Sequence, residues 1–424
     1  MVTRLRLAVI GAGLRGMTYA REGLRSGQAV VTALAEPRPD RLLAAATELG
    51  VPDGRCTADW RELAARPDLD VDAVVVATPD RQHTEPALAF LERGLPLLLE
   101  KPMAPTEEEA RAIVDAAERS GAIVCVAHVL RYSAYTEVVK GVVDGGGLGD
   151  VVSVEHLEPV GWWHQAHSYV RGNWRREDET NPMLMAKCCH DVDWLAYVVG
   201  RPATRVSSFG SLSHFTAANK PAGAGHRCLD CAVERECPYS AKRIYLEHVH
   251  EPAAQRWPLS VLAVEVTEET IETALREGPY GRCVYDCDND VVDHQVVNLE
   301  YEGGVTASLT MTAFTPMEFR KTRIFGTHGM LEGDGYTVRV LDFLTGRTTT
   351  TQVVDPTDAL AGEGHLGADT ALTRSFLAAV ATRDPSRILT SPAVSLHSHA
   401  TVWAAERARH RGTVERVPGR SEIE

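Results

Sequence analysis

A glycine-rich turn near the amino terminus limits the folds open to this chain more than any other feature. An apolar strand, Leu5–Ile10, runs into the turn and a helix-like stretch follows it. The pattern is G-x-G-x-x-G, and its three glycines are Gly11, Gly13 and Gly16. Leu14 and Arg15 lie between the second and third glycines. In this context the glycines permit a tight turn and a close backbone approach to a pyrophosphate, which the helix amino terminus binds. The motif therefore predicts a dinucleotide-binding Rossmann unit.

Further apolar runs follow at regular intervals and are separated by helical stretches. They are Ala29–Ala35, Val71–Ala77, Leu95–Leu99 and Ile123–Ala127. Continuous apolar runs of this kind are typical of parallel strands that are buried on both faces. We therefore predict an α/β fold that begins with a doubly wound parallel sheet over residues 1–128.

The pattern changes after residue 128. Asp293–Thr312 is typical of a long hairpin that turns at Gly303 and Gly304, and apolar residues alternate with Ser and Thr in its second arm. Such alternation indicates an antiparallel sheet with one solvated face. We predict that residues 129–424 form a C-terminal α/β domain with a large open antiparallel sheet and a polar, cysteine-containing insert at about 216–240. Helices near 370–382 and 395–409 are expected to pack behind this sheet.

The charge balance and the lengths of the apolar runs disfavour two classes of function. Lys and Arg number 44 against 58 Asp and Glu, which gives a net charge of −14 and disfavours a nucleic-acid-binding protein. No apolar run approaches the roughly 18 residues of a membrane span, and the amino terminus does not have the pattern of a signal peptide. We therefore expect a cytoplasmic protein with neither nucleic-acid nor membrane partners.

The residue that ends the second strand bears on the choice of cofactor. Glu36 lies 20 residues beyond Gly16. An acid at this place accepts hydrogen bonds from ribose hydroxyls and repels a 2′-phosphate, which favours NAD. Arg38 could accommodate that phosphate, so NADP is the less favoured alternative. Lys101 directly follows another buried strand, at the sheet edge where ligands of open α/β folds bind.

Together these residues resemble the Gfo/Idh/MocA family of NAD(P)-dependent sugar and polyol oxidoreductases. Later matching segments are 190–193 (His-Asp-Val-Asp) and 326–329 (Gly-Thr-His-Gly). The resemblance implies that the open sheet covers the nicotinamide and carries the contact of a homo-oligomer, a dimer or tetramer. The cofactor-binding residues it implies, besides the glycine turn, are Glu36, Arg38, Thr78, Pro79, His83, Glu100 and Lys101.

By the same resemblance, Lys101 binds and polarises the reacting hydroxyl and His190 is the general base. The family pattern has an Asp four residues before this His, where the present sequence has Ala186. Lys187 is the candidate to replace the missing polar partner. A base near neutrality and a cation beside the developing oxyanion are what hydride removal from a carbinol requires.

Polar and aromatic residues between positions 162 and 182 suggest a carbohydrate pocket, since aromatic faces stack on sugars while Arg and His bind hydroxyls. The alternative is a buried aromatic anchor for a long connection. The predicted substrate residues, which include others near the last Rossmann strand, are His128, Arg131, Tyr132, His167, Arg171, Trp174 and Asp193.

Cysteines cluster in the polar insert. Cys228, Cys231 and Cys237 have the spacing C-x₂-C-x₅-C, and Cys283 or Cys287 could supply a fourth ligand. Four thiolates suit a structural zinc ion, with Cys283 as the favoured fourth ligand. An iron–sulfur cluster and free buried thiols are the alternatives.

Three functions follow from these patterns. The favoured one is an NAD-dependent oxidoreductase that transfers hydride between nicotinamide and a secondary hydroxyl of a sugar, cyclitol or sugar derivative. The second is an NAD-dependent glycoside hydrolase that oxidises C3 transiently, eliminates the aglycone, adds water and reduces again. The third is a non-catalytic dinucleotide sensor. Net formation of NADH indicates the oxidoreductase, and release of an aglycone without net NADH indicates the hydrolase. The sensor shows neither activity.

Overall fold

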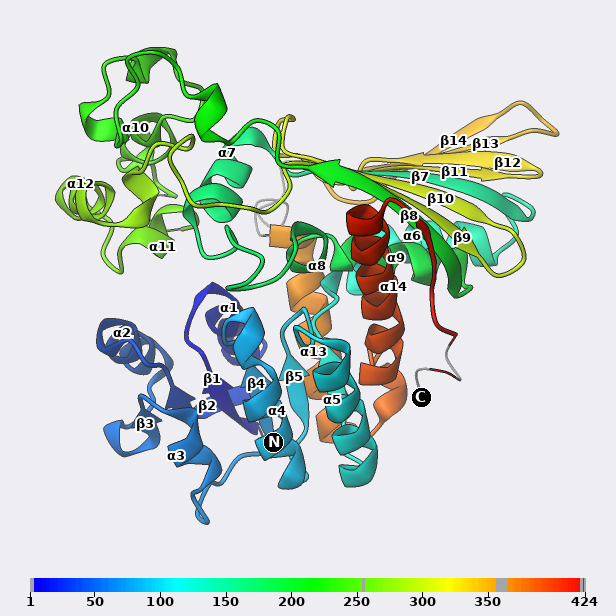
Figure 1. Ribbon diagram of the computed structural model, residues 1–424. Helices are drawn as coiled ribbons and strands as arrows, with labels where there is room; N and C mark the ends of the chain where they lie inside the picture. Colours follow the sequence, from blue (N-terminus) through cyan, green and yellow to red (C-terminus); the bar gives the residue numbers. More distant parts are fainter. Residues whose placement is uncertain (1–3, 254–255, 356–363, 420–421, 423–424) are drawn as a thin grey trace.

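A six-stranded, entirely parallel sheet forms the amino-terminal domain of the computed structural model, which describes residues 4–253, 256–355, 364–419 and 422 (Figure 1). The strand order is β3-β2-β1-β4-β5-β6. The strands are β1 Leu5–Ile10, β2 Ala29–Ala35, β3 Cys56–Thr57, β4 Ala73–Val76, β5 Leu97–Leu99 and β6 Val124–Val126. The predicted doubly wound sheet is confirmed. Because the order reverses between β1 and β4, the glycine turn that leaves β1 lies at the switch point where such sheets bind ligands.

Helices cover both faces of this sheet. They are α1 Leu14–Arg25, α2 Pro39–Leu49, α3 Trp60–Ala64, α4 Thr84–Glu92 and α5 Glu107–Ser120. Helix α5 is capped at its amino terminus, since the Thr106 side chain accepts a hydrogen bond from the Glu109 amide at 3.2 Å. Capping satisfies one of the amides that have no partner within the helix, so this helix begins where the local sequence dictates.

The second domain contains a nine-stranded sheet in the order β14-β13-β12-β11-β7-β10-β9-β8-β15. Its strands are β7 Val151–Pro159, β8 Ala203–Ser211, β9 His294–Tyr301, β10 Thr306–Thr312, β11 Lys321–Gly326, β12 Gly329–Gly333, β13 Thr337–Asp342, β14 Thr348–Gln352 and β15 Val414–Arg416. The β9–β10 hairpin is as predicted, and Gly303 and Gly304 at its turn have φ of +82° and +86°. Only β7 and β10 pair in parallel, so the sheet is mixed and mostly antiparallel.

One face of this sheet packs on α6 Ala134–Asp144, α9 Cys189–Val199 and α14 Pro392–Arg411 (Figure 1).

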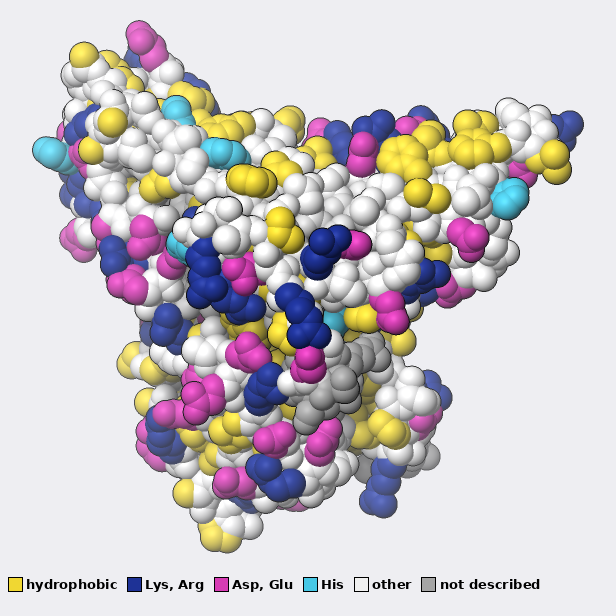
Figure 2. Space-filling model, turned by 45° about the vertical axis from the view of Figure 1, so that its right-hand side comes forward, with side chains coloured by type: hydrophobic (Ala, Val, Ile, Leu, Met, Phe, Trp, Pro, Cys, Tyr) yellow, Lys and Arg dark blue, Asp and Glu magenta, His cyan; other side chains and the backbone are white. Residues whose placement is uncertain are grey.

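Hydrophobic side chains lie along the outer edge of the nine-stranded sheet (Figure 2). Phe209, Phe343 and Leu344 are among the exposed ones. The homo-oligomer expected from an open sheet stays a prediction, which sedimentation analysis tests.

The late helices join the two domains. α13, Ala368–Thr382, packs against α1, and its Leu372 and Phe376 belong to the same buried core as Leu7 of the Rossmann sheet. α14 contacts α5 and β6 as well as β8. The expectation that both helices lie behind the second sheet therefore holds only for α14.

A third group of short helices forms an outer lobe beside the sheet (Figure 1). It contains α7 Trp162–His164, α10 Ala241–Ile244, α11 Leu259–Leu262 and α12 Glu268–Glu277. The lobe has its own buried cluster, which includes Phe215, Tyr245 and Leu275. It reaches the Rossmann domain where Arg41 donates to the Val261 carbonyl at 3.5 Å. Among the described residues, none of the helices combines the length and apolar content that crossing a bilayer requires.

Candidate active site

The three glycines of the turn after β1 differ in what surrounds them. A Cβ on Gly11 would lie 2.5 Å from the Ala77 carbonyl oxygen, and one on Gly16 would lie 2.0 Å from the Gly11 carbonyl oxygen. A Cβ on Gly13 would have only the Arg41 guanidinium near it, at 4.0 Å. Packing therefore requires the first and third glycines, whereas the second borders open space at the amino terminus of α1. That space fits the pyrophosphate of a dinucleotide.

Glu36 is fixed at the end of β2, beside this turn. Its carboxylate accepts hydrogen bonds from the Ala12 amide at 2.9 Å and the Arg38 amide at 3.1 Å, and it is buried. The Arg38 side chain is exposed and pairs with Asp40 at 2.9 Å. A fixed negative charge at the ribose position suits NAD and opposes a 2′-phosphate.

Replacing Gly13 with alanine is expected to weaken NAD binding and to leave the apo-protein's melting temperature unchanged. Gly13 has φ −72°, which any residue adopts, so the new methyl group competes only with the ligand. A clash of about 1–3 kcal/mol lowers affinity about 5- to 150-fold. Calorimetric titration with NAD measures the loss. The matched variant Gly16→Ala should instead lower the melting temperature, and equal melting temperatures for both variants would contradict this assignment.

A polar network fixes the Glu100-Lys101-Pro102 turn that follows β5. Arg15 donates to Glu100 at 2.7 Å and to Asp369 at 2.5 Å, and Tyr19 also donates to Glu100. Burial alone would raise the pKa of Glu100, but the positive charges of Arg15 and Lys101 hold it below its usual value. Glu100 thus stays ionised and serves to position the turn.

His83 joins the turns that follow β4 and β5. Its Nδ1 lies 2.7 Å from the Pro102 carbonyl oxygen, and its Nε2 lies 2.8 Å from the Thr78 carbonyl oxygen. Its ring is buried, while Pro79 is exposed. Both His83 ring nitrogens are used within the protein, so this side chain positions Thr78 and Pro79 at the sheet edge.

Lys101 and His190 come together from separate domains. The Lys101 ammonium donates to the Ala186 carbonyl at 2.6 Å, at the end of the short helix α8 (Met183–Ala186). His190 lies one turn further on, in the first turn of α9. An ammonium carries three N–H donors, so Lys101 keeps donors for a ligand. Lys101 is near enough to His190 for its charge to act on that imidazole, and the catalytic roles of the two residues stay a prediction.

Burial lowers the pKa of His190 well below its usual value, and the nearby charge of Lys101 lowers it further. His128 and His365 stand against the same ring, with centroids 5.8 and 5.6 Å away. Burial lowers the pKa of these two histidines as well. His190 is therefore a neutral imidazole at neutral pH, able to accept a proton. Its Nδ1 is enclosed without a hydrogen-bond partner, which leaves Nε2 for a ligand.

Lys187 enters a second buried network instead of contacting Lys101. Its ammonium pairs with Glu158 at 3.1 Å, and Arg320 bridges Glu158 at 2.6 Å and Asp191 at 2.9 Å. His156 contacts Asp191 at 3.0 Å. Burial alone would raise the pKa of Asp191, but Arg320 and His156 hold it down. The proposed catalytic use of Lys187 stays a prediction; in the structure it balances Glu158.

Several predicted substrate residues are bonded to one another or to the backbone. Arg131 and Asp193 form a buried bidentate pair at 2.6 and 2.7 Å. The Tyr132 hydroxyl lies 3.1 Å from that of Thr390 and accepts from the Leu389 amide. His128 differs, because both of its ring nitrogens are buried without a partner beside His190. Of this group, the structure brings His128 into ring contact with His190.

The aromatic segment divides between two places. Trp174 donates to the Asp80 carboxylate at 3.1 Å and so connects the second domain to the turn after β4. His167 lies in the outer lobe, 2.9 Å from the Tyr245 hydroxyl, and burial lowers its pKa to about 3. Arg171 points into the same lobe, where it donates to the Arg282 and Tyr239 carbonyls at 2.8 Å each. These contacts of His167 and Arg171 agree with the alternative interpretation, in which the segment is a buried anchor for a long connection.

The four cysteines of the predicted zinc site line one cavity of about 230 Å³ in the outer lobe. They are Cys228, Cys231, Cys237 and Cys283. Within the described ranges, however, no three cysteine sulfurs lie within 4.8 Å of one another. A tetrahedral zinc site with 2.3 Å bonds places its sulfurs about 3.8 Å apart. The four cysteines come together around one cavity, as predicted. Their sulfur atoms, however, lie too far apart to bind one zinc ion as the structure places them.

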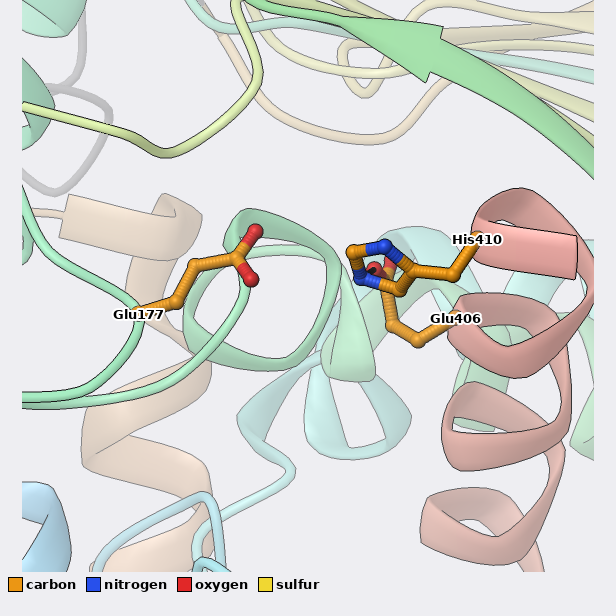
Figure 3. A group of neighbouring side chains, drawn as sticks. All are labelled: Glu177, Glu406 and His410. Atoms are coloured by element: carbon orange, nitrogen blue, oxygen red, sulfur yellow. Dashed lines mark ion pairs between the residues drawn. The ribbon is translucent and has the colours of Figure 1, made fainter.

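A different group has metal-like spacing. Glu177, Glu406 and His410 place their ligand atoms within 4.8 Å of one another, with Glu406 and His410 on α14 (Figure 3). Arg409 lies among them and donates to Glu177 at 3.0 Å and to Glu406 at 2.7 Å. The guanidinium already balances these carboxylates, so the group is an ion-pair network.

Sequence reasoning missed several residues around the candidate site. His365 lies in the turn that precedes α13, and Asp369 lies in the first turn of that helix. Glu158 comes from β7, and Arg320 comes from the loop before β11. Each is an ordinary charged residue in its local sequence. Only the convergence of distant strands gives it a place near Lys101 and His190, so no local signal could have identified it.

Known proteins share both the sequence pattern and the fold. An oxidoreductase family with an NAD-binding Rossmann fold (Gfo/Idh/MocA) matches residues 5–128, and its C-terminal α/β domain matches residues 140–387. Levoglucosan dehydrogenase of Pseudarthrobacter phenanthrenivorans is 28% identical over 46% of this chain and 51% of its own length. Inositol 2-dehydrogenase 4 of Saccharopolyspora erythraea is 30% identical over 52% of this chain and 60% of its own length.

The chain thus spans only half to three fifths of these two curated relatives. A structure of levoglucosan dehydrogenase with NADH superposes with a TM-score of 0.71 at 19% identity, over 98% of this chain and 100% of that one. At that identity the likeness concerns the fold. The two family matches together cover most of the sequence, and this chain therefore belongs to the Gfo/Idh/MocA oxidoreductase family.

Proposed function

We propose that this protein uses NAD to oxidise a secondary hydroxyl of a sugar, a cyclitol or a derivative of one. The observation that carries the proposal is the placement of the Lys101 ammonium and the neutral His190 imidazole at the edge of the parallel sheet. They stand beside an open glycine cradle and a fixed Glu36. These groups support a dinucleotide site with an acid–base pair beside it, where the two domains meet.

The chemistry divides between the coenzyme and two side chains. When bound, NAD⁺ accepts a hydride from the carbon that bears the hydroxyl. Lys101 binds the hydroxyl oxygen through its free N–H groups and stabilises the negative charge that develops on it. His190 accepts the hydroxyl proton at Nε2, since its Nδ1 is enclosed. General-base assistance of this kind contributes about 10²- to 10⁴-fold to the rate.

The named relatives support the substrate class. One is a dehydrogenase of levoglucosan, an anhydrosugar, and the other is a dehydrogenase of inositol, a cyclitol. Both compounds present secondary hydroxyls on a six-membered ring. A simple alcohol with a single hydroxyl would lack the further hydroxyls that these two compounds share.

A panel of sugars, cyclitols and glycosides tests the proposal when NADH formation and leaving-group release are followed together. We expect NADH to form with at least one ring polyol. When NADP replaces NAD, NADPH should form more slowly, because Glu36 opposes the 2′-phosphate. Release of an aglycone without net NADH would replace net oxidation by the redox-assisted hydrolase. NAD binding with neither activity would favour the dinucleotide sensor.

A further inference from the structure

Four cysteines from two distant segments converge in the outer lobe, far from the chemistry proposed above. The thiols around the cavity belong to Cys228, Cys231, Cys237 and Cys283. A β-bridge between Arg227 and Arg282 aligns the two segments, and the Cys283 amide donates to the His226 carbonyl at 2.8 Å. The backbone pairing therefore places Cys283 beside the three cysteines of the insert.

Arg171 supplies a positive charge at this cavity. It is almost fully buried, and its Nη2 donates to the Cys228 sulfur at 3.5 Å. Its Nη1 is enclosed without a partner. Within the described part of the chain, no carboxylate forms an ion pair with Arg171. Glu234 and Glu236 also line the cavity, but the group in contact with the guanidinium is the Cys228 sulfur. A buried guanidinium is stabilised by negative charge, which thiolate ligands at this cavity would supply.

The dimensions of the site favour a group larger than one ion. The cavity measures about 230 Å³, whereas a water molecule occupies about 30 Å³. Its thiols are spread more widely than those around a single zinc. An iron–sulfur cubane separates its four thiolates because each binds a different iron. Arg171 and the Gly225 amide, 3.4 Å from the Cys231 sulfur, donate the hydrogen bonds that cluster sulfurs commonly accept.

We propose that Cys228, Cys231, Cys237 and Cys283 hold a four-iron, four-sulfur cluster that fastens the outer lobe. Four thiolates give a cluster with a 2+ core a net charge of −2, which Arg171 partly balances. Neither Lys101 nor His190 lines this cavity. The role of the cluster is structural, because it joins the insert to the segment after α12. The proposal is independent of the oxidoreductase activity.

Metal and sulfide analysis of the full-length protein, purified without oxygen, tests this directly. We expect about four iron and four acid-labile sulfide per chain, with the broad visible absorption of thiolate-bound iron. Iron X-ray absorption on the same unmodified protein should show sulfur ligands and a short iron–iron distance. About one zinc per chain without sulfide, or no metal after anaerobic reconstitution with iron and sulfide, would overturn the proposal.

Single substitutions assign the ligands. Cys228→Ser and Cys283→Ser should each lower the iron content by at least half after identical reconstitution. Cys287→Ser is the matched control, because Cys287 is close to Cys283 but does not line the cavity. It should keep the wild-type iron content. Iron loss in Cys287→Ser with retention in Cys283→Ser would overturn the ligand set, and the unmodified protein's spectrum decides the case if a variant fails to fold.

Discussion

Replacing His190 with asparagine is expected to lower kcat/KM by about 10²- to 10⁴-fold, the usual contribution of a general base. Asparagine keeps a polar group of similar size in the first turn of α9 but cannot take the hydroxyl proton. Steady-state kinetics with the best substrate of the panel measure the loss, and NAD titration should give wild-type affinity. His410→Asn, an exposed change on α14, is the control and should be silent.

The pH dependence offers a second test of the same residue. The base works only when neutral, and burial together with Lys101 lowers the pKa of His190 well below 6.5. Lowering the pH through 6.5 therefore should not yet protonate it, and activity should fall only at more acidic pH. A kcat/KM profile whose acid limb lies at or above pH 6.5 would show that another group is the base.

Lys101→Met should lower kcat/KM by about 10²- to 10³-fold, the range found when one donor to a developing oxyanion is removed. Methionine retains the length of the side chain and loses its charge. Because Lys101 is half-buried with a backbone carbonyl as its partner, the melting temperature should change little. Lys321→Met, at an exposed position on β11, is the control.

The residual activity of Lys101→Met carries further information. The charge of Lys101 is one of the causes that lower the pKa of His190, second to burial. Removing it should therefore move the acid limb of kcat/KM upward in pH, while burial keeps the limb below 6.5. If the rate fell as expected but the acid limb stayed at the same pH, the charge of Lys101 would not act on His190.

Features with a local sequence signature were predictable. Continuous apolar strands, the glycine spacing and the position of Glu36 each depend on residues within one βαβ unit, so the Rossmann domain and its cofactor turn follow from the sequence. The resemblance extended this to Lys101 and His190. Strand β3 has only two residues, too few for any periodicity, and escaped prediction.

Partner choice between distant segments could not be predicted. Arg131 and Asp193 are 62 residues apart and satisfy each other in the interior, although each alone suits a sugar. Arg171 has the same donors, and only the tertiary structure directs it toward cysteines rather than toward Lys101 and His190. A charged side chain reveals what it can bind, whereas burial and neighbours decide what it does bind.

The packing of α13 against α1 has a consequence for how this protein can be divided. Leu372 and Phe376 cover apolar surface of the nucleotide-binding unit. Asp369, on the same helix, accepts a hydrogen bond from Arg15. A fragment ending at residue 128 would expose that surface to water and lose a partner of the glycine turn. The coenzyme module is therefore discontinuous, and transplanting it into another enzyme requires residues from both ends of the polypeptide.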